Sequence, residues 1–263
     1  MRINTNVNSL NAQESANVTG SKLKSSLEKL SSGLAINKAS DDASGLSIAD
    51  KLRTQASSLG QSISNGNSAS ALTQIADKAM GEQSNILDVI KQKLLQASTA
   101  TTSTEGRNAI AKDINKLLDQ VNNIATQTNY NGQTLLQASH DGKSSTTALT
   151  FQMGELAADV ITTTGAVMAN TSGLTLTSLK DTVAAGGITQ SSASTMLAGI
   201  DTALDTLNGW RSDFGSTQNQ IESSIRNMST AQTNISAAES VIRDVDYAAE
   251  SANFNKQNII SQA

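Results

Sequence analysis

Residues Ser31–Leu52 read SSGLAINKASDDASGLSIADKL, and this stretch lies between two segments whose apolar residues recur with a helical period. The segment before it carries leucines at alternating spacings of four and three, which is typical of a coiled-coil seam: Leu23, Leu27, Leu30 and Leu34. The segment after it begins a second helical stripe with Leu46, Ala49 and Leu52. We therefore predict two helices that meet at a helix-start joint made of Ser40, Asp41 and Asp42.

The two adjacent aspartates of this joint allow a catalytic and a structural interpretation. As an acid and base pair they are poorly placed, because neighbouring residues at a helix start point in different directions and no reactive partner lies nearby in the sequence. As helix-start residues they fit well. Ser40 is a good N-cap, and carboxylates in a first turn gain about 0.3–1 kcal/mol from the helix dipole and free N–H groups. We favour the structural interpretation.

The composition favours long, thin helices over a rounded core. Among 263 residues there is no proline, aromatic residues make up 2% and hydrophobic residues 37%. A rounded core needs large apolar and aromatic side chains, whereas a coiled-coil seam needs only a residue or two per turn. The absence of proline permits helices much longer than average. We predict a mainly α fold, an elongated rod of long coiled-coil-like helices with a small β-hairpin region in the middle of the chain.

The order of the patterns indicates how the chain is folded. The second helical stripe continues to Ala97 past a weak point at Asn65-Gly66-Asn67. Residues Thr99–Gly106 predict a turn, after which the heptad pattern of Ile110–Ile124 predicts a helix that folds back antiparallel on the one before it.

The middle and the end of the chain differ in period. Leu149, Phe151 and Met153 alternate with polar residues, as do Leu174 and Leu176, so we predict a β element with loops at about 130–190. From about residue 192 to residue 249 the helical period returns and predicts one long helix.

Charge and hydropathy exclude several classes of partner. The formal net charge is −4 and the acidic and basic residues are interspersed, so there is no basic footprint for nucleic acid. No apolar run approaches the roughly 20 residues of a membrane span. The N-terminal residues MRINTNVNSL lack the apolar middle of a secretory signal peptide. We predict no nucleic-acid partner, no membrane insertion and, if the protein leaves the cell, export by another route.

The sequence also argues against an enzyme. Its single histidine, His140, precedes Asp141-Gly142 in a predicted loop, and one histidine cannot form an HExxH zinc motif. The absence of cysteine excludes disulfides and thiolate metal sites. The glycines are scattered and form no phosphate-cradling loop. We predict no catalytic, cofactor-binding or metal site, and no cofactor.

The helical segments at the two ends of the chain have few partners within it. Long helices depend on packing for their stability, so uncovered seams favour self-association into a homo-oligomer. We predict that subunits assemble through the first leucine seam, Leu23, Leu27, Leu30 and Leu34, and through a late seam, Ile235, Ile242 and Val245.

Several motifs together resemble those of one family, the bacterial flagellins. They are INTNVNSL near the N-terminus, LSSGLAINKASDDASGLSIADKLR, TNYNGQTLL, FQMGE and the late block NISAAESVIRDVDYAAESANFNKQNIISQA. These motifs occur in flagellin order, and the resemblance covers residues 1 to about 155 and 195–263. The sequence looks similar to flagellins of the Campylobacter and Helicobacter group.

The resemblance implies a structural subunit of the flagellar filament, a helical homo-oligomer used for swimming. It implies export through the flagellar type III secretion channel and a secreted, extracellular location in the flagellum. The implied partners are the filament cap, the hook-filament junction proteins and the flagellar export chaperone. It also implies that residues 1–40 and 241–263 form arms of an inner coiled-coil domain and 41–240 a rod domain, with outer domains minimal or absent.

Two departures from the family pattern carry expectations of their own. Family members continue beyond the Gln262-Ala263 at which this sequence stops, so the C-terminal arm looks incomplete. Many flagellins also carry an LQRVRELAVQ-like stretch that Toll-like receptor 5 binds, and here Ile86–Gln96 reads ILDVIKQKLLQ. Val89 falls where the key arginine lies, which removes a donor of several directed hydrogen bonds. In this altered receptor-recognition stretch, Val89, Lys91, Lys93 and Gln96, we predict weak receptor recognition.

Two alternatives remain open beside the flagellin interpretation. A hook-filament junction protein shares the terminal helices but does not propagate a filament, so elongation on filament seeds separates the two. A secreted coiled-coil adhesin would have no exposed apolar stripe in the monomer, whereas uncovered heptads at both ends favour assembly.

Overall fold

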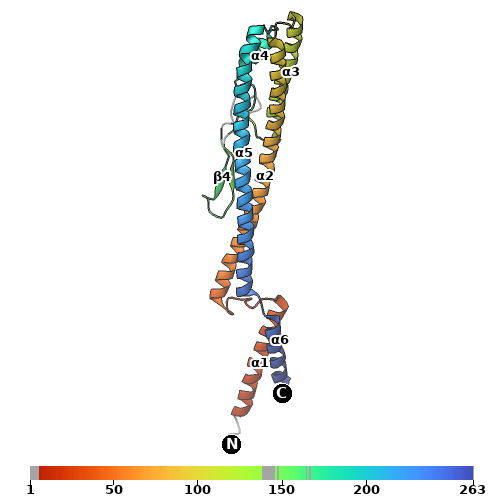
Figure 1. The fold of residues 1–263 in the computed structure, drawn as a ribbon. Helices are drawn as coiled ribbons and strands as arrows, with labels where there is room; N and C mark the ends of the chain where they lie inside the picture. Colours follow the sequence, from red (N-terminus) through yellow and green to blue (C-terminus); the bar gives the residue numbers. More distant parts are fainter. Residues whose placement is uncertain (1–5, 138–145, 147, 164, 166, 263) are drawn as a thin grey trace. The chain divides into compact units, whose positions relative to one another are not determined.

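The computed structural model describes residues 6–137, 146, 148–163, 165 and 167–262, and these residues are mainly helical (Figure 1). The helices are α1 (Val7–Ser32), α2 (Ala43–Ser98), α3 (Thr104–Gln127), α4 (Thr177–Ala184), α5 (Gln190–Arg243) and α6 (Tyr247–Gln262). The strands are β1 (Asn129–Tyr130), β2 (Gln133–Thr134), β3 (Thr150–Gln152) and β4 (Val160–Thr162). The predicted class, long helices with a small β region in the middle of the chain, is confirmed.

The chain divides into two compact units. Unit 1 contains the chain up to Gly60 and from Ser229 onward, and unit 2 contains Gln61–Met228. Helices α2 and α5 each contribute to both units. The predicted division into 1–40, 41–240 and 241–263 refers to the layers of an assembly, and it stays a prediction.

In unit 2, helices α3 and α5 both run antiparallel to α2 (Figure 1). On α3, Asp113 pairs with Lys93 of α2 at 2.9 Å, whereas the later residue Val121 meets the earlier residue Gln83. Positions on α3 therefore rise as positions on α2 fall, which confirms the predicted fold-back.

The pairing of α5 with α2 follows the same rule. Asp201 pairs with Lys91, and the later residue Arg211 pairs with the earlier residue Asp77, the two distances being 2.5 and 2.9 Å.

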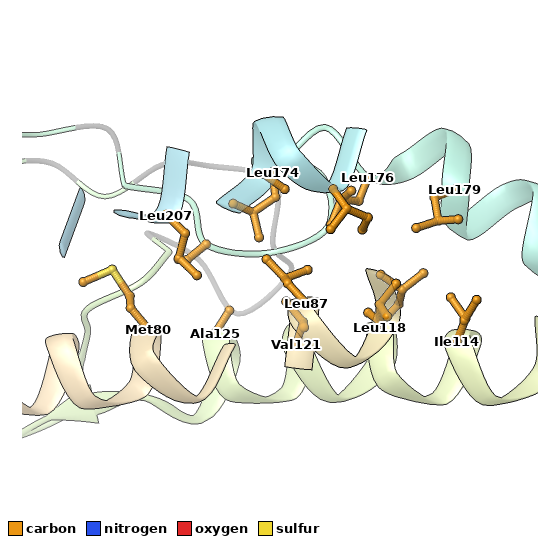
Figure 2. Packing of buried hydrophobic residues seen from close by; sticks show 14 of the residues in the cluster. Met80, Leu87, Ile114, Leu118, Val121, Ala125, Leu174, Leu176, Leu179 and Leu207 are labelled. Atoms are coloured by element: carbon orange, nitrogen blue, oxygen red, sulfur yellow. The ribbon is translucent and has the colours of Figure 1, made fainter. Parts of the chain in front are cut away.

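The core of unit 2 lies between these three helices and the segment that precedes α5. Figure 2 shows Met80 and Leu87 of α2, Leu118 and Val121 of α3 and Leu207 of α5 pointing toward one another. From the other side the same cluster is covered by Val167, Ala169, Leu174, Leu176, Leu179, Val183 and Ile188, all buried. A fully buried leucine of this kind contributes about 1.5–3 kcal/mol.

This covering segment corrects part of the prediction for residues 130–190. Leu174 and Leu176 alternate with polar residues but do not lie in a strand. They lie in a turn that leads into α4, and α4 buries Leu179 and Val183 against the core. The alternation indicated burial correctly, but a short buried turn places every second side chain inward just as a strand does.

The β structure is limited to two small antiparallel pairs. β1 pairs with β2 across the turn at Asn131-Gly132, where both residues have positive φ, 51° and 83°. Asparagine and glycine are the residues that tolerate this conformation, as tight hairpins require. β3 pairs with β4, with Phe151 opposite Ile161. The predicted loop at Asp141-Gly142 lies outside the described residues.

Helix α2 is continuous through the predicted weak point at Asn65-Gly66-Asn67. A Cβ atom on Gly66 would meet Ile225 Cγ1 and Met153 Cε at 2.8 Å. Glycine at this position therefore permits close packing of α5 and the residue after β3, and it does not end the helix. The predicted turn after α2 is confirmed at residues 99–103, and Ser103 caps α3 by accepting a hydrogen bond from Gly106 N at 3.1 Å.

Candidate functional site

Helix α1 lies in unit 1 and ends before Gly33. The leucine seam predicted a helix that continues to Leu34. Gly33 has φ 75°, a left-handed conformation that favours glycine, and its N–H donates to Lys29 O at 2.9 Å. Leu34, predicted as the last member of the helical seam, lies beyond this cap and forms an isolated antiparallel bridge with Asp244. We call residues Gly33–Asp42 the first break, since they separate α1 from α2.

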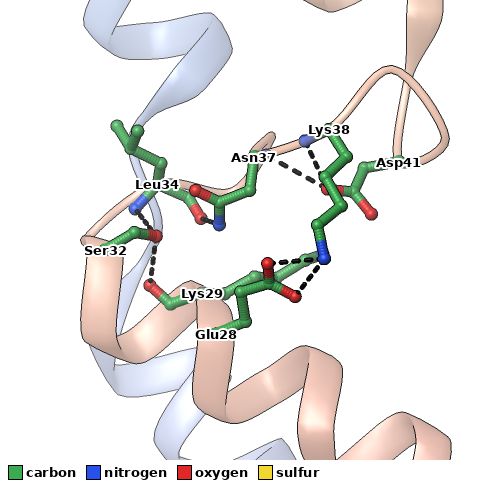
Figure 3. A network of polar contacts seen from close by, with 7 residues as sticks. All are labelled: Glu28, Lys29, Ser32, Leu34, Asn37, Lys38 and Asp41. Atoms are coloured by element: carbon green, nitrogen blue, oxygen red, sulfur yellow. Dashed lines mark hydrogen bonds and ion pairs between the residues drawn. The ribbon is translucent and has the colours of Figure 1, made fainter.

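The carboxylate of Asp41 stabilises a backbone turn inside the first break (Figure 3). Its Oδ2 accepts hydrogen bonds from Asn37 N at 3.1 Å and Lys38 N at 3.0 Å, and its own N–H donates to Lys38 O at 2.9 Å. The two backbone donors, Lys38 first, lower the pKa of the Asp41 carboxyl below its ordinary value, with the charges of Lys29 and Lys38 adding to the effect. Asp41 therefore closes a backbone turn and does not lie in the first turn of α2.

Asp42 is the residue that caps α2, which corrects the prediction that Ser40 does so. The helix begins at Ala43, and Asp42 Oδ1 accepts hydrogen bonds from Ser44 N at 3.0 Å and Gly45 N at 2.9 Å. Ser40 is exposed and lies three residues before the helix start. Both residue types are good N-caps, so the sequence alone did not distinguish them. The two aspartates have separate structural roles, one in the turn and one at the helix start.

An ion pair lies beside this turn. Lys38 Nζ approaches Glu28 Oε1 at 2.6 Å, and both side chains are largely exposed (Figure 3). The hydrogen bond and charge of Glu28 raise the pKa of Lys38 above its ordinary value. Because the pair is exposed to solvent, it adds little to stability.

A second break separates α5 from α6 at Asp244–Asp246, where the sequence predicted an uninterrupted helix to about residue 249. Asp246 Oδ1 accepts hydrogen bonds from Ala248 N and Ala249 N at 3.0 and 3.1 Å, so it caps α6 as Asp42 caps α2. Val245, predicted as a seam residue, is half-buried in this break. The apolar spacing alone gave no sign of the break, because α5 ends at Arg243 and Asp246 starts α6 without a glycine or proline between them.

Backbone hydrogen bonds join the two breaks. Ala35 N donates to Arg243 O at 2.7 Å, and Val245 N donates to Gly33 O at 3.0 Å. These bonds and the Leu34 bridge hold the end of α1 beside the end of α5. Further along, Ser26 of α1 donates a hydrogen bond to Glu250 of α6, and these two helices lie side by side (Figure 1).

The helices α1 and α6 expose most of their apolar side chains. Ser26 is the one buried residue that α1 has, and α6 has none. The exposed large apolar residues of these two helices are Val7, Leu10, Val18, Leu27, Tyr247, Ile259 and Ile260. We call this set the uncovered apolar faces of α1 and α6.

Of the predicted seam residues, only Leu27 belongs to the uncovered apolar faces of α1 and α6. Leu27 is 56% exposed, whereas Leu23, Leu30, Ile235 and Ile242 are half-buried. Their role in assembly stays a prediction. The exposed apolar residues of α6 were missed, because the predicted late seam ended at Val245 and nothing in the sequence pattern indicated that a separate helix follows it.

The altered receptor-recognition stretch lies on α2 in unit 2. Val89 is 40% exposed and Gln96 is exposed. The two lysines are engaged within the chain, Lys91 with Asp201 of α5 at 2.5 Å and Lys93 with Asp113 of α3 at 2.9 Å. The hydrogen bond and then the charge of Asp201 raise the pKa of Lys91, and the hydrogen bond and then the charge of Lys93 lower the pKa of Asp113.

Metal sites and membrane spans find no support within the described ranges. No group of three or more His, Cys, Asp or Glu residues there is arranged to hold a metal ion. None of the helices in the part that the structure describes has the length and apolar character to span a bilayer. His140, discussed above as a loop residue, lies outside the described residues.

Two family models match the chain. The bacterial flagellin N-terminal helical region matches residues 3–141, and the bacterial flagellin C-terminal helical region matches residues 197–263. Together these matches cover more than half of the chain and include both breaks and both terminal helices.

Similar proteins include flagellins from two bacterial groups. Flagellin A of Helicobacter felis is 50% identical over 160 residues, which is 61% of this chain and 30% of that protein. Flagellin A of Helicobacter pylori is 50% identical over 153 residues, 58% of this chain and 29% of that protein. The flagellin of Bacillus subtilis is 32% identical over 286 residues, covering 100% of this chain and 93% of that protein. The chain thus spans less than a third of the two Helicobacter relatives.

Two solved structures are similar in fold. The crystal structure of Bacillus cereus flagellin has a TM-score of 0.52 and 26% identity, covering 67% of this chain and 94% of that one. The structure described as a flagellar hook-associated protein from Vibrio parahaemolyticus has a TM-score of 0.66 and 12% identity, covering 77% of this chain and 99% of that one. At this low identity the second likeness shows the fold alone.

Proposed function

The chain belongs to the bacterial flagellin family, and from this premise we propose that it is a structural subunit that polymerises into the flagellar filament. Flagellins are structural filament proteins and not enzymes, and we assign no catalytic role to any residue. The observation that carries the proposal is the presence of the uncovered apolar faces of α1 and α6 on helices that bury almost nothing within the chain.

These faces support assembly on energetic grounds. Exposed apolar surface costs free energy in water, at roughly 25 cal/mol for each Å² that a neighbour would cover. Leu27, Tyr247 and Ile259 are each more than half exposed, at 56, 63 and 68%. A helical array of identical subunits covers such faces with copies of themselves, whereas a monomeric protein rarely leaves large apolar patches in solvent.

Seeded elongation tests this proposal. Purified chain is added to sonicated flagellar filament seeds, and the products are measured by sedimentation and negative-stain microscopy. A parallel chain that carries the C-terminal end of a flagellin relative controls for a requirement for that end. We expect filaments to lengthen with chain concentration; a failure of both versions to elongate would overturn the proposal.

A matched pair of variants locates the contacts. Leu27→Ser and Ile259→Ser should prevent elongation while the circular dichroism spectrum of the monomer stays unchanged. Ser25→Ala and Ser261→Ala change neighbouring positions on the same helices without touching the apolar faces, and we expect them to elongate normally. Equal loss of elongation in all four variants would argue against these faces as the contact.

The proposed route and location follow from the proposed assembly. We propose export through the flagellar type III channel, an extracellular position in the flagellum, and contacts with the filament cap, the junction proteins and the export chaperone. Family membership supports these steps. Secretion by a strain that lacks its own filament protein, compared with the same strain lacking the export gate, measures the route directly.

We further propose weak recognition by Toll-like receptor 5. Val89 presents an apolar side chain where the family's receptor-binding arginine lies, and Lys91 and Lys93 are already paired with Asp201 and Asp113. Binding that uses either lysine must first break an ion pair. A receptor-reporter cell assay with purified monomer tests this: we expect little signal from the native chain and a gain with Val89→Arg. Potent activation by the native chain would refute the proposal.

The hook-filament junction protein is the second candidate. The Vibrio structure shares the fold, which a filament subunit and a junction protein have in common, and the family models and the Bacillus relative favour a filament subunit. A junction protein caps seeds once and does not lengthen them, so the elongation assay separates the two. The adhesin alternative is disfavoured by the exposed apolar faces, which an independent coiled coil would cover.

A further inference from the structure

A pocket of about 370 Å³ in unit 2 is lined by helix α2, the β1–β2 hairpin and strand β3. These three elements contribute, among others, Leu72, Tyr130 and Phe151. Pockets that bind small molecules in proteins have volumes of about 300–1,000 Å³, so this one is large enough for such a ligand. All of its described lining residues lie within unit 2, and the pocket is therefore formed by one chain without the assembly proposed above.

The apolar part of this pocket is fixed to the core. Ala69 and Leu72 of α2 are buried, at 2 and 6% exposure. Tyr130 and Phe151 are half-buried and pack against the core cluster of unit 2, so their rings are held in place while they line the pocket. The face of an aromatic ring is partly negative and attracts the partly positive C–H groups of a molecule that lies on it.

The polar part of the pocket has unused hydrogen-bonding capacity. Asn131, Gln133 and Thr150 line it with exposed side chains, and Tyr130 adds its hydroxyl. Within the part of the chain that the structure describes, the side chains of these four residues form no hydrogen bond. Two amides and two hydroxyls are therefore free to bind a ligand as donors and as acceptors.

A second pocket of about 370 Å³, lined by residues of α4 and α5 and the turn before α4, differs in this respect. Its threonine hydroxyls are engaged with the backbone: Thr175 donates to Leu174 O at 2.7 Å, and Thr195 donates to Ser191 O at 3.0 Å. Two similar volumes thus differ in chemistry, and the pocket beside the β1–β2 hairpin is the better suited to a polar ligand.

The absence of charge narrows the class of ligand. None of the described residues that line the pocket beside the β1–β2 hairpin is charged. An ionic ligand would lose its hydration there without gaining an opposite charge, which is unfavourable. A sugar hydroxyl is a donor and an acceptor at once, as the side-chain amides and hydroxyls of the pocket are together. A pyranose ring also has an apolar C–H face, which suits the rings of Tyr130 and Phe151.

We propose that this pocket binds an uncharged pyranose sugar, either free or at the end of a glycan. The sugar ring lies against Tyr130 and Phe151, and its hydroxyls bind the side chains of Asn131, Gln133 and Thr150. This binding site is separate from the uncovered apolar faces of α1 and α6, which lie in unit 1.

Amide signals of the ¹⁵N-labelled chain, followed during titration with sugars, test the proposal. The probes are the methyl glycosides of glucose, galactose, mannose and N-acetylglucosamine. We expect at least one of them to shift the amides of Asn131 and Thr150 in a saturable way, with a dissociation constant on the order of 1 mM because the contacts are few. The amides of Ser192 and Thr195, at the second pocket, should not shift.

Three results of this titration would overturn the proposal. They are no saturable shift with any of the four glycosides, shifts confined to Ser192 and Thr195, and tighter binding of adenosine than of every sugar at Asn131 and Thr150. The last result would assign the pocket to planar aromatic ligands. Where a sugar binds, a disaccharide of the same unit distinguishes the two sources: tighter binding than the monosaccharide supports a glycan, and equal binding supports a free sugar.

Variants locate the binding site. Gln133→Ala and Thr150→Val each remove one proposed hydrogen bond, and we expect either to weaken sugar binding roughly three- to tenfold. Asn123→Ala removes an exposed amide from α3 that does not line the pocket, and it should leave the affinity unchanged. Native amide signals at Ile114, which is fully buried, show that each variant is folded. Native affinity in both pocket variants would contradict the proposed site.

Discussion

Leu118 in α3 and Leu27 in α1 both belong to heptad patterns, yet Leu118 is fully buried and Leu27 is 56% exposed. The difference comes from the number of elements available to each unit. In unit 2 three long helices and the segment before α5 surround one core, so each apolar stripe faces another. In unit 1, α1 and α6 pack mainly against each other, and this pairing leaves Leu27, Tyr247 and Ile259 more than half exposed. The same kind of pattern therefore encodes a core in one unit and a surface in the other.

Truncating the two leucines gives the largest expected effect. Leu118→Ala should lower the free energy of unfolding by about 2–5 kcal/mol, because it leaves a cavity in a packed core. Leu27→Ala should change it by less than about 0.5 kcal/mol, as exposed substitutions do. Chemical denaturation followed by circular dichroism measures both. Equal losses in the two variants would mean that α1 is packed in the free chain and that the comparison fails.

A buried polar side chain in unit 2, Gln83, gives a second test of how the two units differ in packing. Gln83 is fully buried and its Nε2 donates to Val121 O at 3.0 Å and to Ala169 O at 2.6 Å, which ties α2 to α3 and to the covering segment. Gln83→Ala should cost about 1–3 kcal/mol by leaving a buried acceptor without its partner. Gln74→Ala, on the exposed face of the same helix, should have almost no effect on the denaturation midpoint. If Gln83→Ala left the free energy of unfolding unchanged, packing alone would position the covering segment.

We expect a smaller loss of stability from substitution at the start of α2, in unit 1. Asp42→Ala removes the cap of α2 and should lower stability by about 1 kcal/mol, whereas Ser40→Ala should be neutral because Ser40 lies outside the helix. Thermal unfolding of the two variants side by side measures this difference. A larger loss with Ser40→Ala would assign the cap to the residue that the sequence suggested first.

The ion pairs on the surface of unit 2 predict the smallest effect. Lys91→Ala breaks the pair with Asp201, and because its side chain is 38% exposed, solvent screens the pair and the loss of stability should be small. Lys78→Ala on the same helix is the control. High salt should reduce the difference between the two variants, and a salt-independent loss would mean that Lys91 acts through packing of its aliphatic stem.

Much of the fold could be predicted from periodicity, and the failures have a common cause. The heptads of α2, α3 and α5 are correctly placed because each stripe meets a partner, which is what a hydrophobic period reports. The early end of α1 at Gly33, the cap at Asp42 and the break at Asp244–Asp246 were predicted wrongly or missed. The starts of α2 and α6 are decided by the carboxylates of Asp42 and Asp246, which accept hydrogen bonds from backbone N–H groups, and several neighbouring polar residues could have done the same. The end of α1 is decided by the left-handed conformation of Gly33.

The sequence predicted where the candidate site lies, but not all of the residues that form it. Exposed apolar seams at both ends of the chain were expected, and the uncovered apolar faces of α1 and α6 agree with them in location. The particular residues differ, because the exposed apolar residues of α6 are Tyr247, Ile259 and Ile260, whereas the predicted late seam ended at Val245. A period carries no information about which residues remain uncovered, since that depends on how many neighbours the fold supplies.

Hydrogen exchange of α1 and α6 in the free chain and in assembled filaments tests the central claim most directly. The account predicts rapid exchange of both helices in the free chain and strong protection in the filament, while α3 is protected in both states. Protection of α1 and α6 that is already complete in the free chain, or absent in the filament, would contradict the claim that other subunits cover these faces.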